Sequence, residues 1–484
     1  MRVVREHRGV RGFDLPVVVT PARPGLASLL LAASDVLAVA LAWWLAVQGR
    51  LLAGGVLSPD LYWRLWPGLA LFVAAYALHG LYPGFGLNPA EELRRATVST
   101  SLVHLTVGAA TFVVRGAEVY SRAVFLVAWV LAAALVPLGR AAVRHAFSRK
   151  RWWGYPVLIL GAGRTGELVA RGLQQTPGLG LRPVAFLDDD PAKPARVAGL
   201  PVLGGIDLAP RIAREAGITH ALVAMPGAGR ERLLQVVERC GACFSHVLVV
   251  PDLFGLSSLW VAARDLQGTV ALEVRQQLLL PGPRLLKRVL DLAATLALGL
   301  FSLPVLALVA VAVKLDSPGP VFFAQTRIGK GGRKFRAWKF RTMVRDAEEV
   351  LERYLLEHPE LREEWLQDQK LRRDPRVTRV GRFLRRTSLD ELPQLWNVLR
   401  GEMSLVGPRP IVDAEVPRYG PRFALYAQVL PGITGLWQVS GRNDTTYEER
   451  VELDSYYVRN WSPWLDLYIL ARTVWVVLTA RGAY

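Results

Sequence analysis

The stretch LLKRVLDLAATLALGLFSLPVLALVAVAVKLDSPGP, residues 285–320, decides the arrangement of the C-terminal half of this chain. Its central 25 residues, from Val289 to Val313, contain one charged side chain, and a helix of that length can cross a bilayer. Pro304 lies mid-segment, where it removes a backbone hydrogen bond and favours a bend. A full crossing would also carry the arginine-rich remainder of the chain across the membrane, against the positive-inside tendency. We therefore predict a re-entrant helix, at about 285–314, that returns to the face it came from.

The composition of the whole chain indicates a membrane protein with basic cytoplasmic surfaces. The 484 residues are 52% apolar and have a mean hydropathy of +0.25, yet their formal net charge is +18. Soluble proteins seldom combine these properties, whereas membrane proteins with basic faces do. No zinc-finger or RNP-like motif occurs, so we expect no nucleic-acid partner. We assign the charge to inner-leaflet lipids and an anionic substrate, and the length predicts two or three domains.

Four apolar segments fill most of the first 145 residues, at about 26–48, 62–81, 97–114 and 121–143. Each approaches the roughly 20 residues that cross a bilayer core. Basic residues gather before the first segment, between the second and third, and after the fourth. The positive-inside rule therefore places both ends in the cytoplasm, and we predict a multi-pass, four-helix transmembrane bundle over residues 1–148.

A glycine-rich turn follows the fourth segment. In VLILGAGRTG an apolar strand leads into Gly161, Gly163 and Gly166, in the order G-x-G-x-x-G, and the next strand-like run, PVAFL, leads to Asp188. This is the layout of a dinucleotide fingerprint, in which glycines allow close approach of the pyrophosphate and the acid binds ribose hydroxyls. Further alternating strands and helices predict a Rossmann-like parallel α/β domain over residues 149–280.

Nucleotide binding by this domain is a weaker inference than its fold, because the same glycines serve any tight strand-to-helix turn. A dehydratase or dehydrogenase of this type needs a Tyr-x-x-x-Lys pair for proton transfer, and the chain contains none. We therefore expect ligand sensing or scaffolding, with a candidate nucleotide site at the glycine turn, rather than redox catalysis.

The stretch TSLDELPQLWNVL, which begins at Thr387, places Asp390 and Glu391 side by side before an apolar run. Directly upstream, residues 370–386 hold eight Lys or Arg and a single acid. Ser388 and Glu391 have the spacing of a helix capping box, which is a structural reason for the pair. Catalysis is the other interpretation, and the local sequence alone leaves both open.

Cations on loops punctuated by Gly or Pro favour the catalytic interpretation. Lys339 and Arg341 lie in FRAWKFRTM, Arg409 in SLVGPRPIV and Arg442 in LPGITGLWQVSGRN. Arginine holds phosphate oxygens bidentately, so such loops suit a pyrophosphate. Among these cations we expect Asp390 to stay ionised, and hence nucleophilic, at neutral pH. The neighbouring carboxylate suits Mg²⁺, which prefers oxygen ligands and bridges phosphates.

From about residue 285 to 484 the chain resembles the bacterial sugar transferase family, the monotopic phosphoglycosyl transferases. The matching blocks are KRVLD, GPVFFAQTRIGKGGRKFRAWKFRTM, RRTSLDELPQLWNVLRGEMSLVGPRP and PGITGLWQVSGRN. The predicted spans and Rossmann-like domain match the polytopic branch of this family, with the catalytic domain at 281–484. Within that branch, LYPGFGLNPAEELRR resembles the undecaprenyl-phosphate galactose phosphotransferases, which begin O-antigen or exopolysaccharide synthesis at the bacterial inner membrane.

The resemblance implies transfer of a sugar-1-phosphate, with galactose the expected sugar, from a UDP-sugar to undecaprenyl phosphate, with release of UMP. It implies that Asp390 attacks the sugar-bearing phosphorus to give a phosphosugar-aspartyl intermediate, and that Glu391, together with Asp390, holds Mg²⁺. The positions that match the family's phosphate-binding cations, with one further acid, are Lys339, Arg385, Arg409, Arg442 and Asp454. It also implies a membrane-associated, mainly α catalytic domain on the cytoplasmic face.

Two other functions stay open: a membrane-bound nucleotide-sugar dehydratase, and a non-enzymatic scaffold of polysaccharide export in which the acid pair only caps a helix. The missing Tyr-x-x-x-Lys pair opposes the first. Galactose and glucose differ at one hydroxyl, so the sequence does not choose between them. A homodimer is expected because symmetric pairs are the commonest assembly. Leu303 precedes Pro304 where many relatives carry serine, and Ser302 is the candidate to replace that hydroxyl.

Overall fold

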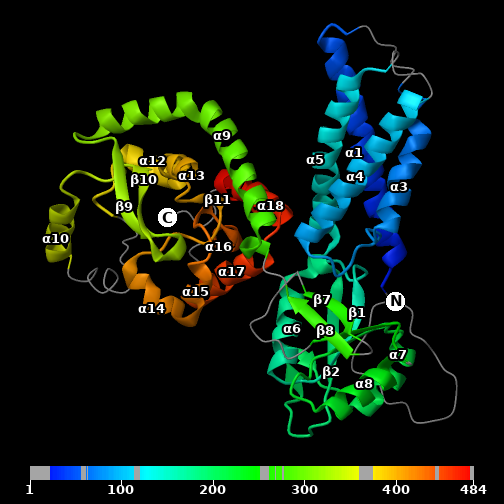
Figure 1. The fold of residues 1–484 in the computed structure, drawn as a ribbon. Helices are drawn as coiled ribbons and strands as arrows, with labels where there is room; N and C mark the ends of the chain where they lie inside the picture. Colours follow the sequence, from blue (N-terminus) through cyan, green and yellow to red (C-terminus); the bar gives the residue numbers. More distant parts are fainter. Residues whose placement is uncertain are drawn as a thin grey trace. The chain divides into compact units, whose positions relative to one another are not determined.

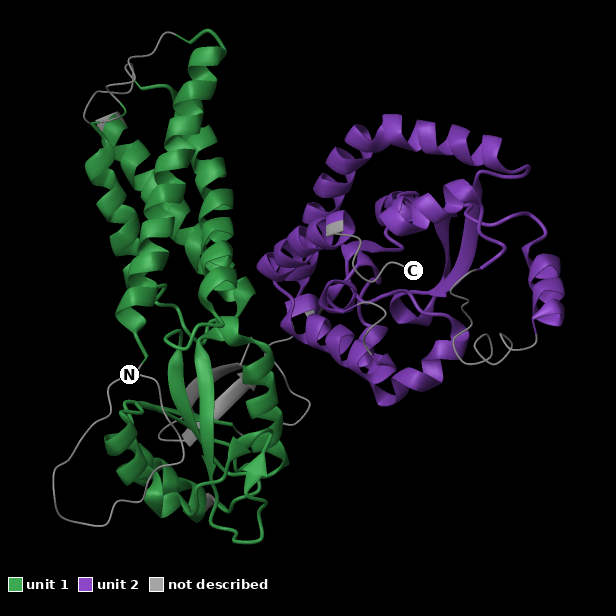
Figure 2. Ribbon diagram, turned by 180° about the vertical axis from the view of Figure 1, so that it is seen from behind, with its two compact units in different colours: residues 1–254 green, residues 255–484 purple. Residues whose placement is uncertain are grey.

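A computed structural model gives the fold of the chain. It describes residues 22–55, 62, 64–113, 120–241, 243–250, 261–266, 269–274, 277–358, 374–441 and 446–479. The chain forms two compact units, Met1–Phe254 and Gly255–Tyr484 (Figure 2). The predicted bundle and α/β domain thus share one unit, and the second unit begins ahead of the boundary expected at residue 281.

The first unit begins with α-helices that stand side by side (Figure 1). Their bounds are α1 Pro24–Leu52, α3 Leu69–Leu78, α4 Pro89–Val113 and α5 Arg122–Phe147. Of these, α1 and α5 are long and apolar enough to cross a membrane. The helix α3 is shorter, and the first turns of α4 carry Glu91, Glu92, Arg94 and Arg95. Length and composition therefore support two of the four predicted spans.

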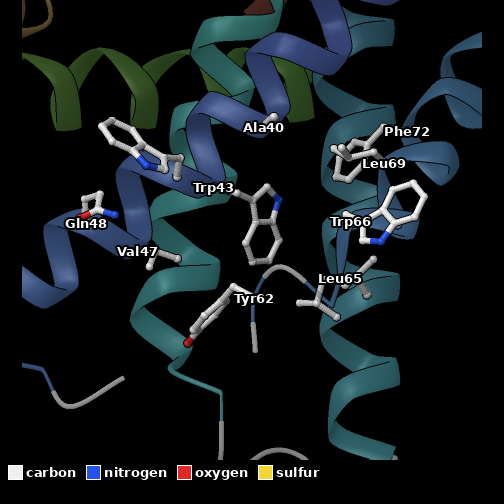
Figure 3. A pocket seen from close by; sticks show the side chains of 12 residues that line it. Ala40, Trp43, Val47, Gln48, Tyr62, Leu65, Trp66, Leu69 and Phe72 are labelled. Carbon is white, nitrogen blue, oxygen red and sulfur yellow. The ribbon is translucent and has the colours of Figure 1, made fainter. Parts of the chain in front are cut away.

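Small and aromatic side chains fill the space between these helices. Buried alanines on α1 and α5 let the two backbones approach closely. The buried cluster consists of Ala38, Val39, Ala42, Phe72, Tyr76, Leu81, Ala96, Val103, Ala132 and Val136. An apolar pocket of about 210 Å³ opens beside it, lined by residues that include Trp43, Trp66 and Phe72 (Figure 3). This pocket belongs to the first unit, whereas the acid pair belongs to the second.

A buried ion-pair network connects the helices to the α/β domain. Arg140 of α5 is 1% exposed and donates to Asp35 of α1 at 2.6 Å and to Glu92 of α4 at 2.8 Å. Arg144, one turn later, pairs with Glu92 and donates to the carbonyl of Gly178 in the α/β domain at 2.7 Å. In the sequence these arginines count only as basic residues after a predicted span; in the structure they hold the first unit together.

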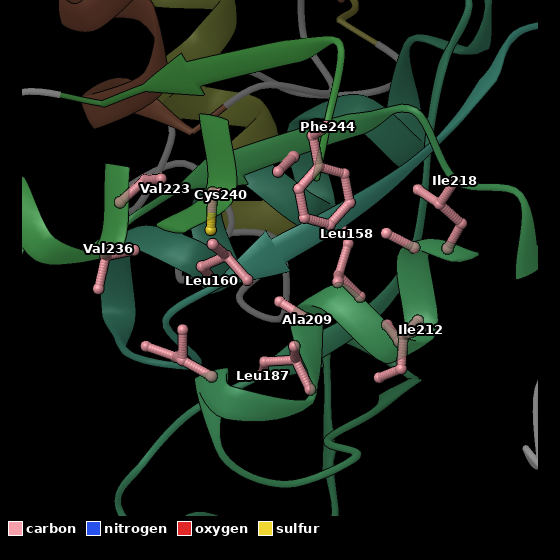
Figure 4. Close-up of a cluster of buried hydrophobic side chains, with 14 residues drawn as sticks. Leu158, Leu160, Leu187, Ala209, Ile212, Ile218, Val223, Val236, Cys240 and Phe244 are labelled. Atoms are coloured by element: carbon pink, nitrogen blue, oxygen red, sulfur yellow. The ribbon is translucent and has the colours of Figure 1, made fainter. Parts of the chain in front are cut away.

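A parallel sheet in the order β2-β1-β5-β6 forms the core of the α/β domain. Its strands are β1 Tyr155–Leu160, β2 Leu181–Leu187, β5 His220–Val223 and β6 His246–Val249. The other elements are α6 Arg164–Gln175, α7 Ala209–Ala216, α8 Arg230–Gly241, β3 Arg196–Val197 and β4 Leu200–Pro201. Apolar strand residues such as Leu158, Leu160 and Leu187 pack against the helices (Figure 4). The predicted parallel α/β fold is confirmed.

The second unit contains α9, which runs from Pro281 to Asp316. It is a third helix long and apolar enough to cross a membrane, and Figure 1 shows that it changes direction along its length. Pro304 lies inside it, and the hydroxyl of Ser302 donates to the carbonyl of Gly299 at 3.1 Å. The apolar helix agrees with expectation. Ser302 bonds Gly299 and not Leu300, whose carbonyl loses its usual donor at Pro304, so its replacement of the missing serine and the return of the chain to the same membrane face both stay predictions.

The remaining elements of the second unit form a mainly α domain, as predicted (Figure 1). The strands are β7 Val261–Leu266, β8 Thr269–Val274, β9 Phe322–Ile328, β10 Lys334–Phe340, β11 Ser404–Val406 and β12 Gly432–Thr434. The helices are α10 Ala347–Glu357, α12 Arg379–Thr387, α13 Gln394–Arg400, α14 Val416–Tyr419, α15 Phe423–Tyr426, α16 Leu436–Ser440, α17 Tyr447–Asn460 and α18 Pro463–Thr479. The first two strand pairs are antiparallel and the third is parallel.

Buried charges fix the first turns of α9 to this domain. The Lys287 ammonium lies 2.8 Å from Asp466 of α18 and 3.2 Å from Asp291. Asp291 also accepts hydrogen bonds from the hydroxyl of Ser404 at 2.7 Å and from the N–H of Leu405 at 3.3 Å. The one charge within the apolar core of α9 is therefore bound inside the protein.

Candidate active site

Asp390 and Glu391 lie in a single 3₁₀ turn, Leu389–Glu391, between α12 and α13. The residue before this turn, Ser388, has φ 56° and ψ 19°, which is the left-handed region. Residues other than glycine seldom adopt this conformation, and such strain concentrates at functional sites. The Ser388 side chain makes no capping hydrogen bond to the turn. The capping-box interpretation of the acid pair is therefore wrong.

Lys339, near the end of β10, contacts both acids. Its ammonium nitrogen donates to Glu391 Oε1 at 2.6 Å and lies 3.8 Å from Asp390 Oδ2. Asp390 is buried, with 9% of its surface exposed, so this charge interaction takes place largely out of water. The structure thus brings together three side chains that the sequence placed in one site.

Arg385, in the last turn of α12, is a second cation beside the acid pair. Its Nε donates to the hydroxyl of Thr342 at 3.0 Å, and its charge lowers the pKa of Asp390. Burial lowers the pKa of Arg385 itself, while the charges of Asp374 and Asp390 raise it. The guanidinium is therefore within electrostatic reach of the acid and is held in place through Thr342.

The pKa of Asp390 is raised to about 6, and burial is the largest cause. Lys339 and Arg385 lower this pKa, and the neighbouring Glu391 raises it. Desolvation outweighs the effect of the surrounding cations, so the pKa of this carboxyl is raised and yet stays below neutral pH. Above pH 7 the ionised form still predominates, so the side chain remains a nucleophile.

Arg409, which is half-buried, and the buried Asp454 belong to a second cluster of charged and aromatic side chains. The guanidinium of Arg409 lies over the ring of Trp437 at 5.3 Å. Asp454 is 2% exposed and accepts a hydrogen bond from the hydroxyl of Tyr419 at 2.7 Å. Burial raises the pKa of Asp454 to about 7, although the Tyr419 hydrogen bond and the nearby arginines lower it. At neutral pH this acid carries only part of a negative charge.

Two arginines that sequence reasoning missed connect this cluster to the acid pair. Arg450 of α17 is buried, donates to Glu415 Oε1 at 3.0 Å, and lies over the Trp437 ring at 5.1 Å. Arg327 of β9 lies 3.8 Å from Glu415 Oε2. Burial lowers the pKa of Arg327 and the charge of Glu391 raises it, so these two side chains interact. The available signal was the position of Arg327 in a block that resembles the family.

Two further arginines, Arg341 and Arg442, were predicted to bind substrate. The guanidinium of Arg341 donates to the carbonyls of Ser317 at 2.6 Å and Pro318 at 3.0 Å, directly after α9. It is buried there, so it fixes the end of α9 to the end of β10, and substrate binding by Arg341 stays a prediction. Arg442 lies outside the described residues.

Asp390 and Glu391 fit the predicted Mg²⁺ as a pair of oxygen ligands. Mg²⁺ at phosphate sites is held by one or two carboxylates, with the other ligands from water and substrate phosphates. In the described part of the chain no third acid, histidine or cysteine completes a metal site with them, and Lys339 already bonds Glu391. An ion bound here would take most of its ligands from a diphosphate and from water.

The glycine turn of the first unit has a self-contained geometry. Gly161 has φ 105°, and a Cβ on Gly166 would lie 2.0 Å from the Gly161 carbonyl oxygen, so both glycines are required by the turn. Asp188 folds back and accepts a hydrogen bond from the N–H of Ala162 at 2.7 Å. This carboxylate therefore holds the turn in shape, while the space beside Gly163 is open. Nucleotide binding here stays a prediction.

Two family models match the chain. Residues 282–480 match the bacterial sugar transferase family, and residues 78–251 match a CoA-binding domain. The first match contains the acid pair and every cation assigned to it. The second covers the parallel sheet together with α4, α5 and the loop that precedes them.

Three similar proteins extend over most of the chain. A UDP-galactose-lipid carrier transferase of Erwinia amylovora is 39% identical, over 81% of this chain and 82% of its own. An undecaprenyl-phosphate galactose phosphotransferase of Salmonella typhimurium is 38% identical, over 75% and 77%. A UDP-glucose:undecaprenyl-phosphate glucose-1-phosphate transferase of Escherichia coli is 36% identical, over 74% and 76%.

The apolar helices indicate a membrane protein, and the buried Asp390 beside Glu391 and Lys339 gives a site suited to phosphate chemistry. Such a site fits the enzyme class of phosphoglycosyl transferases. The match to the family model and the extent of the similarity to its members show that the chain belongs to the bacterial sugar transferase family.

Proposed function

We propose that this protein transfers galactose-1-phosphate from UDP-galactose to undecaprenyl phosphate and releases UMP. The observation that carries the proposal is the contact of Lys339 with the buried Asp390 and its half-buried neighbour Glu391. The relatives of Erwinia amylovora and Salmonella typhimurium, at 39% and 38% identity, are named for galactose, and that of Escherichia coli, at 36%, for glucose, which favours galactose. The lipid-linked sugar would begin the synthesis of an O-antigen or an exopolysaccharide.

Asp390 is the nucleophile of the first step. One of its oxygens forms a bond to the sugar-bearing phosphorus, and the bond from that phosphorus to the bridging oxygen breaks, so UMP leaves with the electron pair. Lys339 and Arg385 stabilise the negative charge on the phosphoryl oxygens and on the departing UMP. An oxygen of undecaprenyl phosphate then attacks the same phosphorus and releases the Asp390 carboxylate.

Mg²⁺, when bound, supplies positive charge to the diphosphate. Glu391 would hold it together with Asp390, and the Lys339 hydrogen bond orients the Glu391 carboxylate toward the nucleophile. Arg327, Arg409 and Arg450 form the second group of cations, placed to receive the remainder of the donor. These arginines suit phosphate because each guanidinium donates in a planar fork.

The membrane arrangement follows from the same proposal. A re-entrant α9 would leave the catalytic domain on the cytoplasmic face of the bacterial inner membrane, at the depth of the acceptor's phosphate. The covalent intermediate lets a water-soluble donor and a lipid acceptor use one site in turn. The helices α1, α3, α4 and α5 would anchor the chain as a four-helix bundle, and the working assembly would be a homodimer.

Isotope exchange tests the proposal. Because the first step is reversible, labelled UMP should exchange into UDP-galactose with Mg²⁺ and without any lipid acceptor. Asp390→Asn should abolish the exchange, while Asp413→Asn, which removes an exposed acid, should leave it intact. Exchange that needs undecaprenyl phosphate, or that survives Asp390→Asn, would overturn the mechanism. Faster exchange into UDP-glucose than into UDP-galactose would overturn only the choice of sugar.

A further inference from the structure

The helix α12 has one face that packs inward. Thr378 caps its start by accepting the N–H of Gly381 at 2.9 Å. Its buried side chains pack on the second half of α9, in a cluster of Val309, Val313, Phe340 and Leu384 with Val380 beside it. The N–H of Val380 also donates to Asp316, the last residue of α9, at 3.0 Å. The helix is therefore fixed along a candidate membrane helix.

The opposite face of α12 is basic and exposed. Arg379, Arg382, Phe383 and Arg386 follow the spacing i, i+3, i+4, i+7, so they lie on one side of the helix. All four are exposed, and Phe383 keeps 58% of its surface in contact with solvent. Within the described part of the chain, none of these three guanidinium groups has a hydrogen-bond or ion-pair partner. We call these four residues the outer face of α12.

Two adjacent residues of α12, Arg385 and Arg386, therefore lie on different faces of the helix. Arg385 points inward, bonds Thr342 and acts on Asp390, whereas Arg386 belongs to the outer face. The helix ends at Thr387, and Ser388 leads directly into the turn that carries Asp390. Anything that binds the outer face is thus connected to the acid pair through one short helix.

The surroundings of α12 indicate what covers its outer face. The second half of α9 exposes large apolar side chains: Leu303, Val305, Leu308, Val311 and Leu315. Such a surface needs lipid around it, and α12 lies against that same part of α9. Three arginines around one phenylalanine suit the border of a bilayer, where guanidinium groups bind phosphate and an aromatic ring enters the interface.

We propose that the outer face of α12 docks on the anionic phospholipid headgroups of the membrane surface and thereby positions Arg385 and Asp390. The proposal rests on the proposed function only for its effect on turnover. Docking itself is a property of the helix and does not require catalysis. Because the arginines are exposed, their attraction to lipid phosphates is screened over about 8 Å at physiological salt.

A quenching experiment tests the docking directly. The full chain, with Cys240→Ala and Cys243→Ala to remove its own thiols, carries Phe383→Cys labelled with a fluorophore and is reconstituted in lipid nanodiscs. One set of discs contains phosphatidylcholine alone, and the other also contains phosphatidylglycerol; both hold a lipid with a headgroup-level quencher. We expect stronger quenching in the anionic discs, and a loss of that difference at high salt.

Two triple variants give the matched comparison. Arg379→Gln/Arg382→Gln/Arg386→Gln should abolish the difference, with each arginine contributing about fivefold to the apparent affinity for anionic lipid. Lys330→Gln/Arg333→Gln/Lys334→Gln removes the same charge from the β9–β10 turn, at the end of the hairpin away from Asp316 and the second half of α9, and should preserve the difference. Equal quenching in both kinds of disc, or a difference that survives the α12 triple variant, would overturn the proposal.

Turnover provides the second readout. In anionic discs the wild-type chain should release UMP about fivefold faster than in phosphatidylcholine discs, and the α12 triple variant should show one rate in both. If quenching depends on anionic lipid but no UMP is released by any form, docking stands and the proposed function fails. If quenching is absent while UMP release is normal, the proposed function stands and docking fails.

Discussion

The ammonium group of Lys339 and the carboxylate of Glu391 form a 2.6 Å ion pair between residues 52 positions apart in the chain. The same ammonium stands 3.8 Å from Asp390, and its charge is the largest of the effects that lower the Asp390 pKa. Because Lys339 comes from a hairpin and the acids follow α12, the site exists only when these elements pack together. The ionisation of the proposed nucleophile therefore depends on a long-range contact.

Lys339→Met should cripple the first chemical step. It removes the cation nearest the acid pair, so the pKa of Asp390 rises further and the leaving phosphate loses a donor; we expect UMP release to fall about 100-fold at pH 7.5. Lys339→Arg keeps the charge and should retain part of the rate. Single-turnover UMP release measures both. Equal rates for Lys339→Met and the wild type would show that this contact is unrelated to the chemistry.

The pH dependence of the same step follows from the pKa of Asp390. Burial raises that pKa to about 6, so protonation removes the nucleophile as the pH falls, and the rate should be half-maximal near pH 6. Asp454→Asn leaves Asp390 in place and should keep this limb of the profile. A rate that stays constant down to pH 5 would exclude Asp390 as the titrating group.

Asp390→Asn should stabilise the fold. A carboxyl whose pKa is raised in the folded state contributes to the free energy of unfolding while it is protonated. That contribution is lost as the pH rises through the folded-state pKa. A shift from 3.8 to about 6 predicts a gain of about 1–3 kcal/mol for the neutral side chain at pH 7.5. Thermal unfolding in detergent measures it, with Asp413→Asn as an exposed control that should change little. A destabilised Asp390→Asn variant would mean that Lys339 and Arg385 stabilise the ionised carboxylate by more than its burial costs.

Arg450 should help to position Trp437 and Arg409 for binding of the UDP-sugar donor. It lies over that ring at 5.1 Å, and Arg409 lies over the same ring at 5.3 Å. Arg450→Met should loosen this stack and raise the KM for the UDP-sugar about tenfold, with a smaller effect on kcat. Arg418→Met is the matched control, because Arg418 lies over Tyr447. A similar rise in KM for both variants, or an unchanged KM for Arg450→Met, would refute this positioning role.

The apolar helix α9 and the parallel sheet were accessible to sequence reasoning because their signals are local. A long apolar run and strand–glycine–helix spacing each lie within a few dozen residues. The four predicted spans rest on equally local apolar runs; α1 and α5 are long and apolar enough to cross a membrane, and crossing by α3 and α4 stays a prediction. The buried hydroxyls of Ser99 and Thr100 on α4 each donate to a helix carbonyl at 2.7 Å, which allows these polar residues to lie between apolar helices.

The sequence predicted which residue types form the site. It did not predict which of the cations face Asp390, or that burial raises the pKa of Asp390. Arg385 and Arg386 are adjacent in sequence, but the helix turns one toward Asp390 and the other outward. Lys339 contacts the acid pair, whereas Arg341, which follows β10, donates its hydrogen bonds to the backbone carbonyls after α9. The burial of Asp390, which raises its pKa, arises from packing between distant segments and leaves no local pattern.

The central claim is that Asp390 becomes covalently attached to the phosphosugar. Intact-protein mass spectrometry after rapid quenching tests it most directly, with UDP-galactose and Mg²⁺ and without lipid. We expect a mass increase of one hexose phosphate, located by fragmentation on Asp390, absent from Asp390→Asn and discharged by undecaprenyl phosphate. An unmodified wild-type chain that still releases UMP, or an adduct on another residue, would contradict it.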